Sequence, residues 1–185
     1  MTRLRADAAR NVEGIRRAAL DVFRASGLTT PLDEVAKAAG VSKGTIYHRF
    51  GSRQALIDAV VDDLVAERLR AIIEAVSSFD DPRTRFEEYL MRIWLLQYDE
   101  PAANDVLVRA LPDSVQLTTL CDKANRFGRQ LLEAAQSAGA IRPDLTPTDL
   151  TYLLLERGAA LRACPEQSRP DYTRRLTFLL HGLRT

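Results

Sequence analysis

The chain has 185 residues, of which 46% are hydrophobic and 28% charged, and it carries a formal net charge of +1. This composition is typical of a globular chain that buries a core, and it excludes a fibrous or low-complexity protein. No apolar run approaches the roughly 18 residues that span a membrane, and the first residues lack the apolar core of a signal peptide. We therefore expect a cytoplasmic protein that has no membrane partner.

Metal-binding and enzymatic motifs are absent from the sequence. Its two cysteines, Cys121 and Cys164, and its two histidines, His48 and His181, do not stand at the spacing of metal ligands. The sequence also contains no G-x-S-x-G, no P-loop and no H-E-x-x-H motif. We expect no metal site, no cofactor and no enzymatic activity.

Charge is distributed unevenly along the chain. Residues 1–60 contain ten Lys and Arg against six Asp and Glu, whereas residues 61–185 contain 16 against 19. A basic end joined to a mildly acidic remainder favours a nucleic-acid reader that has a separate regulatory or assembly domain.

Apolar residues recur at three- and four-residue intervals along nearly the whole chain, which predicts an all-α fold. The first helix is expected over about 11–26, with Gly27 as its stop. Thr30 is predicted to cap a second helix over 31–39, in which Pro31 takes the first helical position.

A short third helix and a long fourth helix follow. Gly40 ends the second helix, and Ser42 can cap a third that runs to Phe50. Ser52 can cap a fourth helix over about 53–77, whose roughly 25 residues would span about 37 Å. A helix of that length can connect two domains.

Prolines separate the remaining helical patterns. These helices are expected over 83–98, 102–110, 115–138, 147–163 and 170–183.

The third helix is too short to persist by propensity, so it needs a tertiary anchor. A rotation of 100° per residue places Ile46 and Phe50 on one side, where they can pack with Val41 against the second helix. The other side offers hydroxyl groups, an imidazole and a glycine, whose missing side chain permits close approach of the backbone. These groups suit phosphates and base edges. Each residue alone fits a solvated helix better, but their combination beside basic neighbours favours nucleic-acid binding.

The segment GVSKGTIYHRF, residues 40–50, followed by SRQAL, residues 52–56, resembles the signature of the TetR family of transcriptional regulators. The resemblance covers about residues 12–60. It implies a three-helix helix-turn-helix DNA-binding domain over 1–51 and a helical bundle for ligand binding and dimerisation over 52–185. It also implies that the protein represses transcription and that a small molecule relieves the repression.

The resemblance further implies which residues contact a palindromic operator in double-stranded DNA. The third helix would enter the major groove, and the start of the fourth would hold a phosphate. The candidate DNA-binding residues are Thr30, Ser42, Lys43, Gly44, Thr45, Tyr47, His48, Arg49, Ser52 and Arg53. The sequence departs from the family at Pro31, where Ser or Thr is frequent, and at Arg49, where Tyr or His is frequent.

An aromatic-rich stretch is the candidate effector pocket, because buried Trp and Tyr side chains need polar partners. Taken singly, each of these residues fits a plain core better. The candidate ligand-binding residues are Phe86, Tyr89, Ile93, Trp94, Tyr98, Cys121, Phe127 and Tyr152.

The last two expected helices carry leucine stripes that can form a self-complementary seam between two copies of the chain. The alternative is that both stripes close the core of one copy. The candidate homodimer residues are Leu150, Leu154, Leu161, Tyr172, Leu176, Leu179, Leu180 and Leu183.

The function predicted from the sequence is a DNA-binding regulator, most simply a repressor that a small, largely apolar effector releases from its operator. The alternative is a helical dimeric module that docks on a protein or carries a small molecule without reading DNA. The two differ in salt dependence, because contacts to phosphates weaken steeply as salt rises.

Overall fold

The computed structural model describes residues 2–108 and 115–185, without the side chains of residues 2–9 and 62. Helices make up all the regular secondary structure of these residues, so the all-α prediction is confirmed. The elements are α1 (Thr2–Ser26), α2 (Leu32–Ala39), α3 (Lys43–Phe50), α4 (Arg53–Val61), the π-helical turn η1 (Asp62–Ala66), α5 (Glu67–Ser77), α6 (Pro82–Asp99), α7 (Pro101–Leu107), α8 (Val115–Ser137), α9 (Pro147–Ala163) and α10 (Arg169–Gly182).

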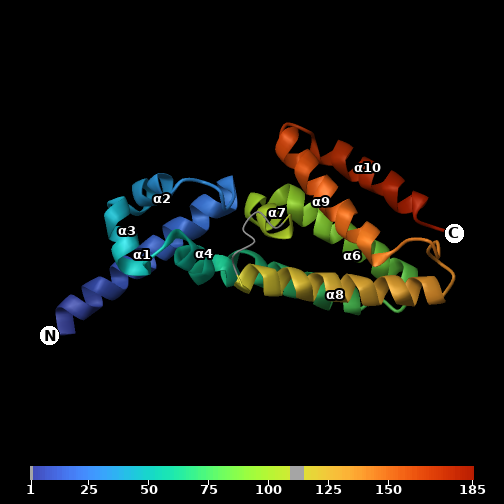
Figure 1. Cartoon of the computed structure of the whole chain (residues 1–185), viewed down its shortest axis with the longest axis horizontal. Helices are drawn as coiled ribbons and strands as arrows, with labels where there is room; N and C mark the ends of the chain where they lie inside the picture. Colours follow the sequence, from blue (N-terminus) through green and yellow to red (C-terminus); the bar gives the residue numbers. More distant parts are fainter. Residues whose placement is uncertain (1, 109–114) are drawn as a thin grey trace.

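The molecule is elongated, with its two termini at opposite ends (Figure 1). Helices α1 to α4, which we call the head, lie at one end, and α5 to α10, which we call the body, form the other. The connection from α4 through η1 to α5 leads from head to body, and α1 also contacts α7 and η1. The head is therefore held to the body both through the chain and across a packed surface.

Two details of the first helices differ from the sequence prediction. Helix α1 begins at Thr2 rather than near residue 11, because good helix formers extend it beyond the apolar stripe. The prediction that Thr30 caps α2 is wrong, since the extended Pro31 takes the cap position and makes no side-chain cap bond. The Thr30 hydroxyl instead donates to the carbonyls of Ser26, at 3.0 Å, and Gly27, at 2.8 Å.

The predicted single helix over 53–77 is interrupted. It consists of α4, η1 and α5, and the π-helical turn lies where the connection passes α1 and α7. Leu64 and Val65 of this turn are fully buried, while Asp63 reaches outward to Arg16 at 3.4 Å. π-helical turns are frequent at functional sites. The connection between head and body is therefore a candidate for a functional segment.

The remaining helices agree with the prediction to within one or two residues, apart from the expected helix over 102–110. Its counterpart α7 ends at Leu107, and residues 109 and 110 lie outside the described residues. Side-chain caps explain the sharp starts: Asp81 accepts from the backbone N–H of Thr84 at 2.8 Å, and Thr146 accepts from that of Asp149 at 3.2 Å. Within residues 2–108 and 115–185, no helix is both long and apolar enough to cross a membrane.

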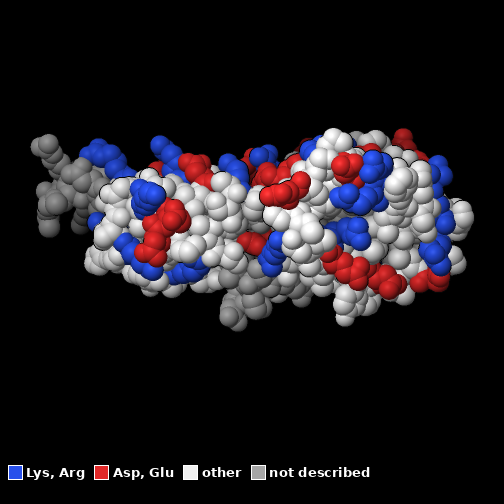
Figure 2. All heavy atoms as spheres, turned by 90° about the horizontal axis from the view of Figure 1, so that it is seen from above, with Lys and Arg blue, Asp and Glu red and all other residues white. Residues whose placement is uncertain are grey.

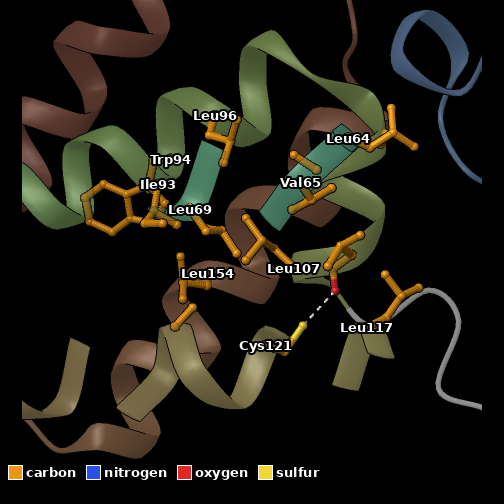
Figure 3. Packing of buried hydrophobic residues seen from close by; sticks show 14 of the residues in the cluster. Leu64, Val65, Leu69, Ile93, Trp94, Leu96, Leu107, Leu117, Cys121 and Leu154 are labelled. Atoms are coloured by element: carbon orange, nitrogen blue, oxygen red, sulfur yellow. Dashed lines mark hydrogen bonds between the residues drawn. The ribbon is translucent and has the colours of Figure 1, made fainter. Parts of the chain in front are cut away.

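Apolar side chains form one continuous core that runs through head and body. Helix α6 lies at the centre of the body, where Trp94 is fully buried among leucines of the surrounding helices (Figure 3). The Cys121 thiol of α8 donates to the carbonyl of Val106 in α7 at 3.1 Å, which fixes these two helices together.

Gly158 lets α9 approach α6 and α7 closely. A Cβ atom on Gly158 would lie 2.2 Å from Cγ1 of Val108 and 2.4 Å from Oδ1 of Asn104. Its carbonyl accepts from Nδ2 of Asn104 at 3.1 Å, while Nε2 of Gln97 donates to Oδ1 of Asn104 at 3.1 Å. Three helices therefore share one buried polar network.

Replacing Gly158 with alanine should destabilise the body, because the new methyl group displaces Val108 and this network. We expect the free energy of unfolding to fall by about 1–3 kcal/mol, measured by chemical denaturation. Gly182→Ala is the matched control, since nothing lies within 4 Å of a Cβ built there. Equal unfolding curves for the two variants would contradict the close packing of α9.

Candidate nucleic-acid interface

Helices α2 and α3 are joined by the tight turn that the sequence predicts. Gly40 adopts a left-handed conformation, with φ of 67°, which a residue with a side chain rarely takes. The backbone N–H of Val41 then donates to the carbonyl of Ala36 at 3.0 Å and closes the end of α2. The turn orients α3 across α2 and against α4, both of which it contacts.

Helix α3 is anchored as its pattern predicts. Ile46 is fully buried, and Phe50 and Val41 are partly buried against the same core. The Ser42 hydroxyl oxygen accepts from the backbone N–H of Thr45 at 3.1 Å, which confirms Ser42 as the cap. An eight-residue helix is thereby fixed in orientation without depending on its own propensity.

The other side of α3 presents a row of polar groups to solvent, which we call the α3 face. Tyr47 keeps 44% of its surface exposed although it is a large aromatic residue. The α3 face consists of Lys43, Gly44, Tyr47, His48 and Arg49, with the partly buried Thr45 beside them. The structure thus brings six of the ten DNA-binding candidates onto one helix surface.

Lys43 is exposed but is not a free cation. Its Nζ atom donates to Oδ2 of Asp33 in α2 at 2.8 Å. This hydrogen bond lowers the pKa of Asp33 and raises the pKa of Lys43, so both groups remain charged at neutral pH. Contact with a phosphate would require Lys43 to exchange or share this partner.

The remaining candidates, outside α3, make hydrogen bonds within the chain. Arg53 donates to the carbonyl of Leu28 and lies over the ring of Phe23, 5.7 Å from its centroid. Partial burial lowers the pKa of this guanidinium. The Ser52 hydroxyl accepts from the backbone N–H of Ala55 at 3.0 Å, which caps α4. These bonds position the start of α4 next to the turn before α2.

Charge on the head is mixed. Figure 2 shows acidic side chains beside the basic ones on this end of the molecule, so this view has no uniformly basic surface. Among the described residues, no three His, Cys, Asp or Glu side chains are grouped so as to hold a metal ion.

One contact between head and body was not predicted from the sequence. Asp105 of α7 is buried, and its Oδ2 atom accepts from the backbone N–H of Leu28 at 2.6 Å. Its Oδ1 atom accepts from Arg162 near the end of α9. Gly27 leaves room for this contact, because a Cβ there would lie 2.6 Å from Oδ2 of Asp105. One carboxylate therefore links the turn after α1 to α7 and α9.

The candidate ligand-binding residues do not gather around one cavity. Phe86, Ile93 and Trp94 lie in the packed core, whereas Tyr152 is 59% exposed on the outside of α9. Tyr89 packs edge-on against Phe127, with ring centroids 5.3 Å apart, and its hydroxyl donates to the carbonyl of Ala124 at 2.7 Å.

The other two candidates of this set also bond within the chain. Cys121 is buried and bonds to Val106, as described above, and the Tyr98 hydroxyl donates to the carbonyl of Gln167 at 2.7 Å. Tyr98 also stacks on Tyr172, with ring centroids 5.0 Å apart. The aromatic stretch therefore belongs mainly to the packed core, as each of its residues taken singly suggests.

The candidate dimer residues lie mostly on the inner sides of α9 and α10. Leu161 and Leu179 are partly buried, and the other six are buried in the core of the single chain: Leu150, Leu154, Tyr172, Leu176, Leu180 and Leu183. The outer sides of the two helices expose other apolar residues, Tyr152 at 59% and Phe178 at 65%. Burial raises the pKa of the inner Tyr172 to about 12, as expected for a phenol removed from water.

An open cleft of about 440 Å³ lies between α8 and the connection from η1 to α5. It contains none of the aromatic candidates. It is lined by Ala66, Leu69, Arg70, Ile73, Val115, Gln116, Thr119, Leu120, Lys123 and Ala124. We call it the α5–α8 cleft.

Comparison with known proteins agrees with this geometry. Residues 15–60 match the family model of bacterial regulatory proteins of the tetR family, and residues 81–185 match the model of the SbtR-like transcriptional regulator C-terminal domain. The regulatory protein RaaS of Mycobacterium tuberculosis is 32% identical over 138 residues, which cover 72% of this chain and 60% of RaaS. This chain therefore aligns with less than two thirds of that relative.

Solved structures show the same architecture. The TetR transcriptional regulator SCO0520 of Streptomyces coelicolor is 28% identical, with a TM-score of 0.55 over 94% of this chain and 98% of its own. FadR of Bacillus subtilis, solved in complex with stearoyl-CoA, has a TM-score of 0.65 at 14% identity over 91% of this chain and 95% of its own. RaaS, SCO0520 and FadR are all named as transcriptional regulators, the class of protein that the sequence predicts. The chain belongs to the TetR family of bacterial transcriptional regulators.

Proposed function

We propose that this protein represses transcription in the cytoplasm by binding a palindromic operator, and that a small effector releases it. The observation that carries the proposal is the α3 face, a polar helix surface fixed by the buried Ile46 and by a tight turn. Family membership supports a function in transcription. The α3 face is the right size for a major groove, which admits one α-helix.

On DNA, each exposed group would have a separate role. Tyr47, His48 and Arg49 can reach base edges and phosphates, and Gly44 permits close approach of the backbone. The N-terminus of α4, next to Ser52, can hold a phosphate with its free backbone N–H groups. Arg53 would then act mainly by keeping α4 in place, since its guanidinium binds the carbonyl of Leu28.

Reading a palindrome requires two copies related by twofold symmetry, with their α3 helices about 34 Å apart. The exposed Tyr152 and Phe178 support pairing through the outer sides of α9 and α10, because a second copy of the chain would remove these two large apolar side chains from water. The inner leucines of these helices would then act indirectly, by keeping the helices in place.

Release would follow from ligand binding in the α5–α8 cleft. One wall of the cleft belongs to η1 and α5, which continue from α4 of the head. The fold accommodates small molecules, as the FadR complex with stearoyl-CoA illustrates. If ligand and operator favour different positions of this connection, each weakens the other by the same factor.

Selection of duplexes from a random pool tests the proposal. We expect the full-length protein to enrich an inverted repeat whose half-site centres are about 10 base pairs, or a multiple of that, apart. Enrichment that depends on Tyr47 would support reading by α3. If no sequence is enriched at low salt, the protein does not read DNA and the proposed function is wrong.

Asp33→Asn should tighten operator binding about three- to tenfold at low salt, because it frees Lys43 for a phosphate. Fluorescence anisotropy with a labelled duplex measures the effect. Glu34→Gln is the matched control, since it removes the same charge one residue away. Equal tightening in both variants would assign the effect to net charge rather than to release of Lys43.

Phe178→Arg should weaken the dimer at least about tenfold, because it places a charge in an apolar interface. Analytical ultracentrifugation over a concentration series measures the dissociation constant. Val115→Arg is the control, because Val115 is exposed at 79% but lies on α8. An unchanged dissociation constant for Phe178→Arg would place the interface elsewhere.

A further inference from the structure

The α5–α8 cleft has an apolar interior. Leu69 and Ile73 of α5 face Leu120 of α8 across it, and Ala66 and Ala124 leave it open by their small size. Its volume of about 440 Å³ lies in the range of pockets that hold small organic molecules. The cleft can therefore cover an apolar chain or ring of a few carbon atoms.

The charged side chains that the structure describes in the cleft are all positive. Arg70 stands on the α5 wall and Lys123 on the α8 wall, and no Asp or Glu is among the described side chains that line the cleft. Neither cation forms an ion pair with any carboxylate whose side chain the structure describes, which excludes those of residues 1–9, 62 and 109–114. The Nε atom of Arg70 donates to the carbonyl of Ala66 at 3.2 Å, which holds the arginine stem along the wall.

A second groove on the body also contains cations, but these are paired with carboxylates. It lies between α5, α6 and the start of α10, and it also contains arginines. Each of these arginines has an acidic partner within 3.0 Å, in the pairs Arg68–Glu100, Arg92–Glu88 and Arg169–Asp99. The α5–α8 cleft differs because neither of its two cations has such a partner among the described side chains.

We propose that the α5–α8 cleft binds an amphiphilic organic anion, an aliphatic carboxylate in the simplest case. The carboxylate lies between Arg70 and Lys123, and the apolar chain covers Leu69, Ile73 and Leu120. An apolar surface with a few charged groups gives both affinity and orientation to such a ligand. The role of this ligand as the effector rests on the proposed function. Its binding to the cleft is independent of that function.

Binding of three probes with the same eight-carbon chain tests the charge preference. Isothermal titration calorimetry on the full-length protein without DNA compares octanoate, 1-octanol and octylammonium. We expect saturable binding of octanoate at least about tenfold tighter than that of octanol, and no saturable binding of octylammonium. Equal affinity for octanoate and octanol, or tighter binding of octylammonium, would overturn the proposal.

Variants locate the site. Arg70→Gln and Lys123→Gln should each weaken octanoate binding about three- to tenfold and leave octanol binding unchanged. Arg126→Gln is the matched control, because this arginine is exposed on α8 but does not line the cleft. If the control weakens octanoate binding as much as the other two variants, or if none does, the anion binds elsewhere and the proposal fails.

A separate titration keeps the two proposals apart. Octanoate is added to the complex with the selected operator duplex, and anisotropy follows the release. Octanoate that binds the free protein but releases no DNA would support the anion site and contradict its role as the effector site. Absence of any operator binding would contradict the proposed function and leave the calorimetric result valid.

Discussion

Replacing Asp105 with alanine is expected to lower the free energy of unfolding by about 2–4 kcal/mol. The variant leaves the backbone N–H of Leu28, a fully buried residue, without its acceptor. It also removes the only carboxylate that the described part of the chain places against Arg162. Because Arg162 is half exposed and regains water, most of the loss should come from the buried N–H group. Chemical denaturation measures the change.

Two further measurements separate this linkage from a general loss of stability. Asp105→Asn keeps an oxygen acceptor for Leu28 and should lose clearly less stability than Asp105→Ala. Amide hydrogen exchange at Leu28 should accelerate in the alanine variant more than exchange in α8, since the head loosens from the body first. Asp144→Ala, at an exposed carboxylate paired with Arg142, should leave unfolding nearly unchanged. If Asp105→Ala unfolds like the unmodified protein, Asp105 does not hold head and body together.

Tyr47→Ala and Lys43→Gln should each weaken operator binding at least about tenfold while the melting temperature stays within a few degrees. Both side chains are exposed and neither supports the core. Besides contacts to DNA, Lys43→Gln removes only the exposed ion pair with Asp33, which contributes little to stability. Tyr47→Ala should affect binding to the selected sequence more than to random DNA, whereas Lys43→Gln should weaken both and reduce the salt dependence. Fluorescence anisotropy with the two duplexes, together with thermal unfolding, measures these effects.

Arg142→Gln is the matched control for charge, because Arg142 lies on the body in the loop after α8. It should leave DNA affinity unchanged. A variant at Tyr47 or Lys43 that melts at a much lower temperature would show that the residue supports the fold. Unchanged DNA affinity of both variants would remove α3 from the reading surface.

Local signals in the sequence predict the head well. The turn at Gly40, the cap at Ser42 and the buried Ile46 each follow from a residue type at a fixed offset in the chain, and the structure confirms all three. The cap predicted at Thr30 is wrong. Its cap role depended on Pro31 starting α2, but the extended backbone of Pro31 moved the start of the helix by one residue.

The body is harder to predict because periodicity shows which side of a helix is apolar and does not show what covers it. Leu176 and Leu180 lie at the spacing of a dimer seam yet are buried in the single chain. The aromatic stretch likewise fills the core instead of lining a cavity, with Tyr89 close to the backbone of Gly128. The sequence does carry a signal for Asp105. It is an acid within a short apolar helix, and the structure shows that the alanines and aliphatic residues around it are buried. Such an acid needs a buried partner.

The most direct test of the central claim is the salt dependence of binding to the DNA immediately upstream of the protein's own coding sequence. The account predicts tight binding that clearly prefers this DNA over a scrambled duplex and that weakens at least about tenfold between 50 and 200 mM salt. Absence of binding even at the lowest salt would contradict the account, and a salt-insensitive complex with a protein partner would favour a docking module instead.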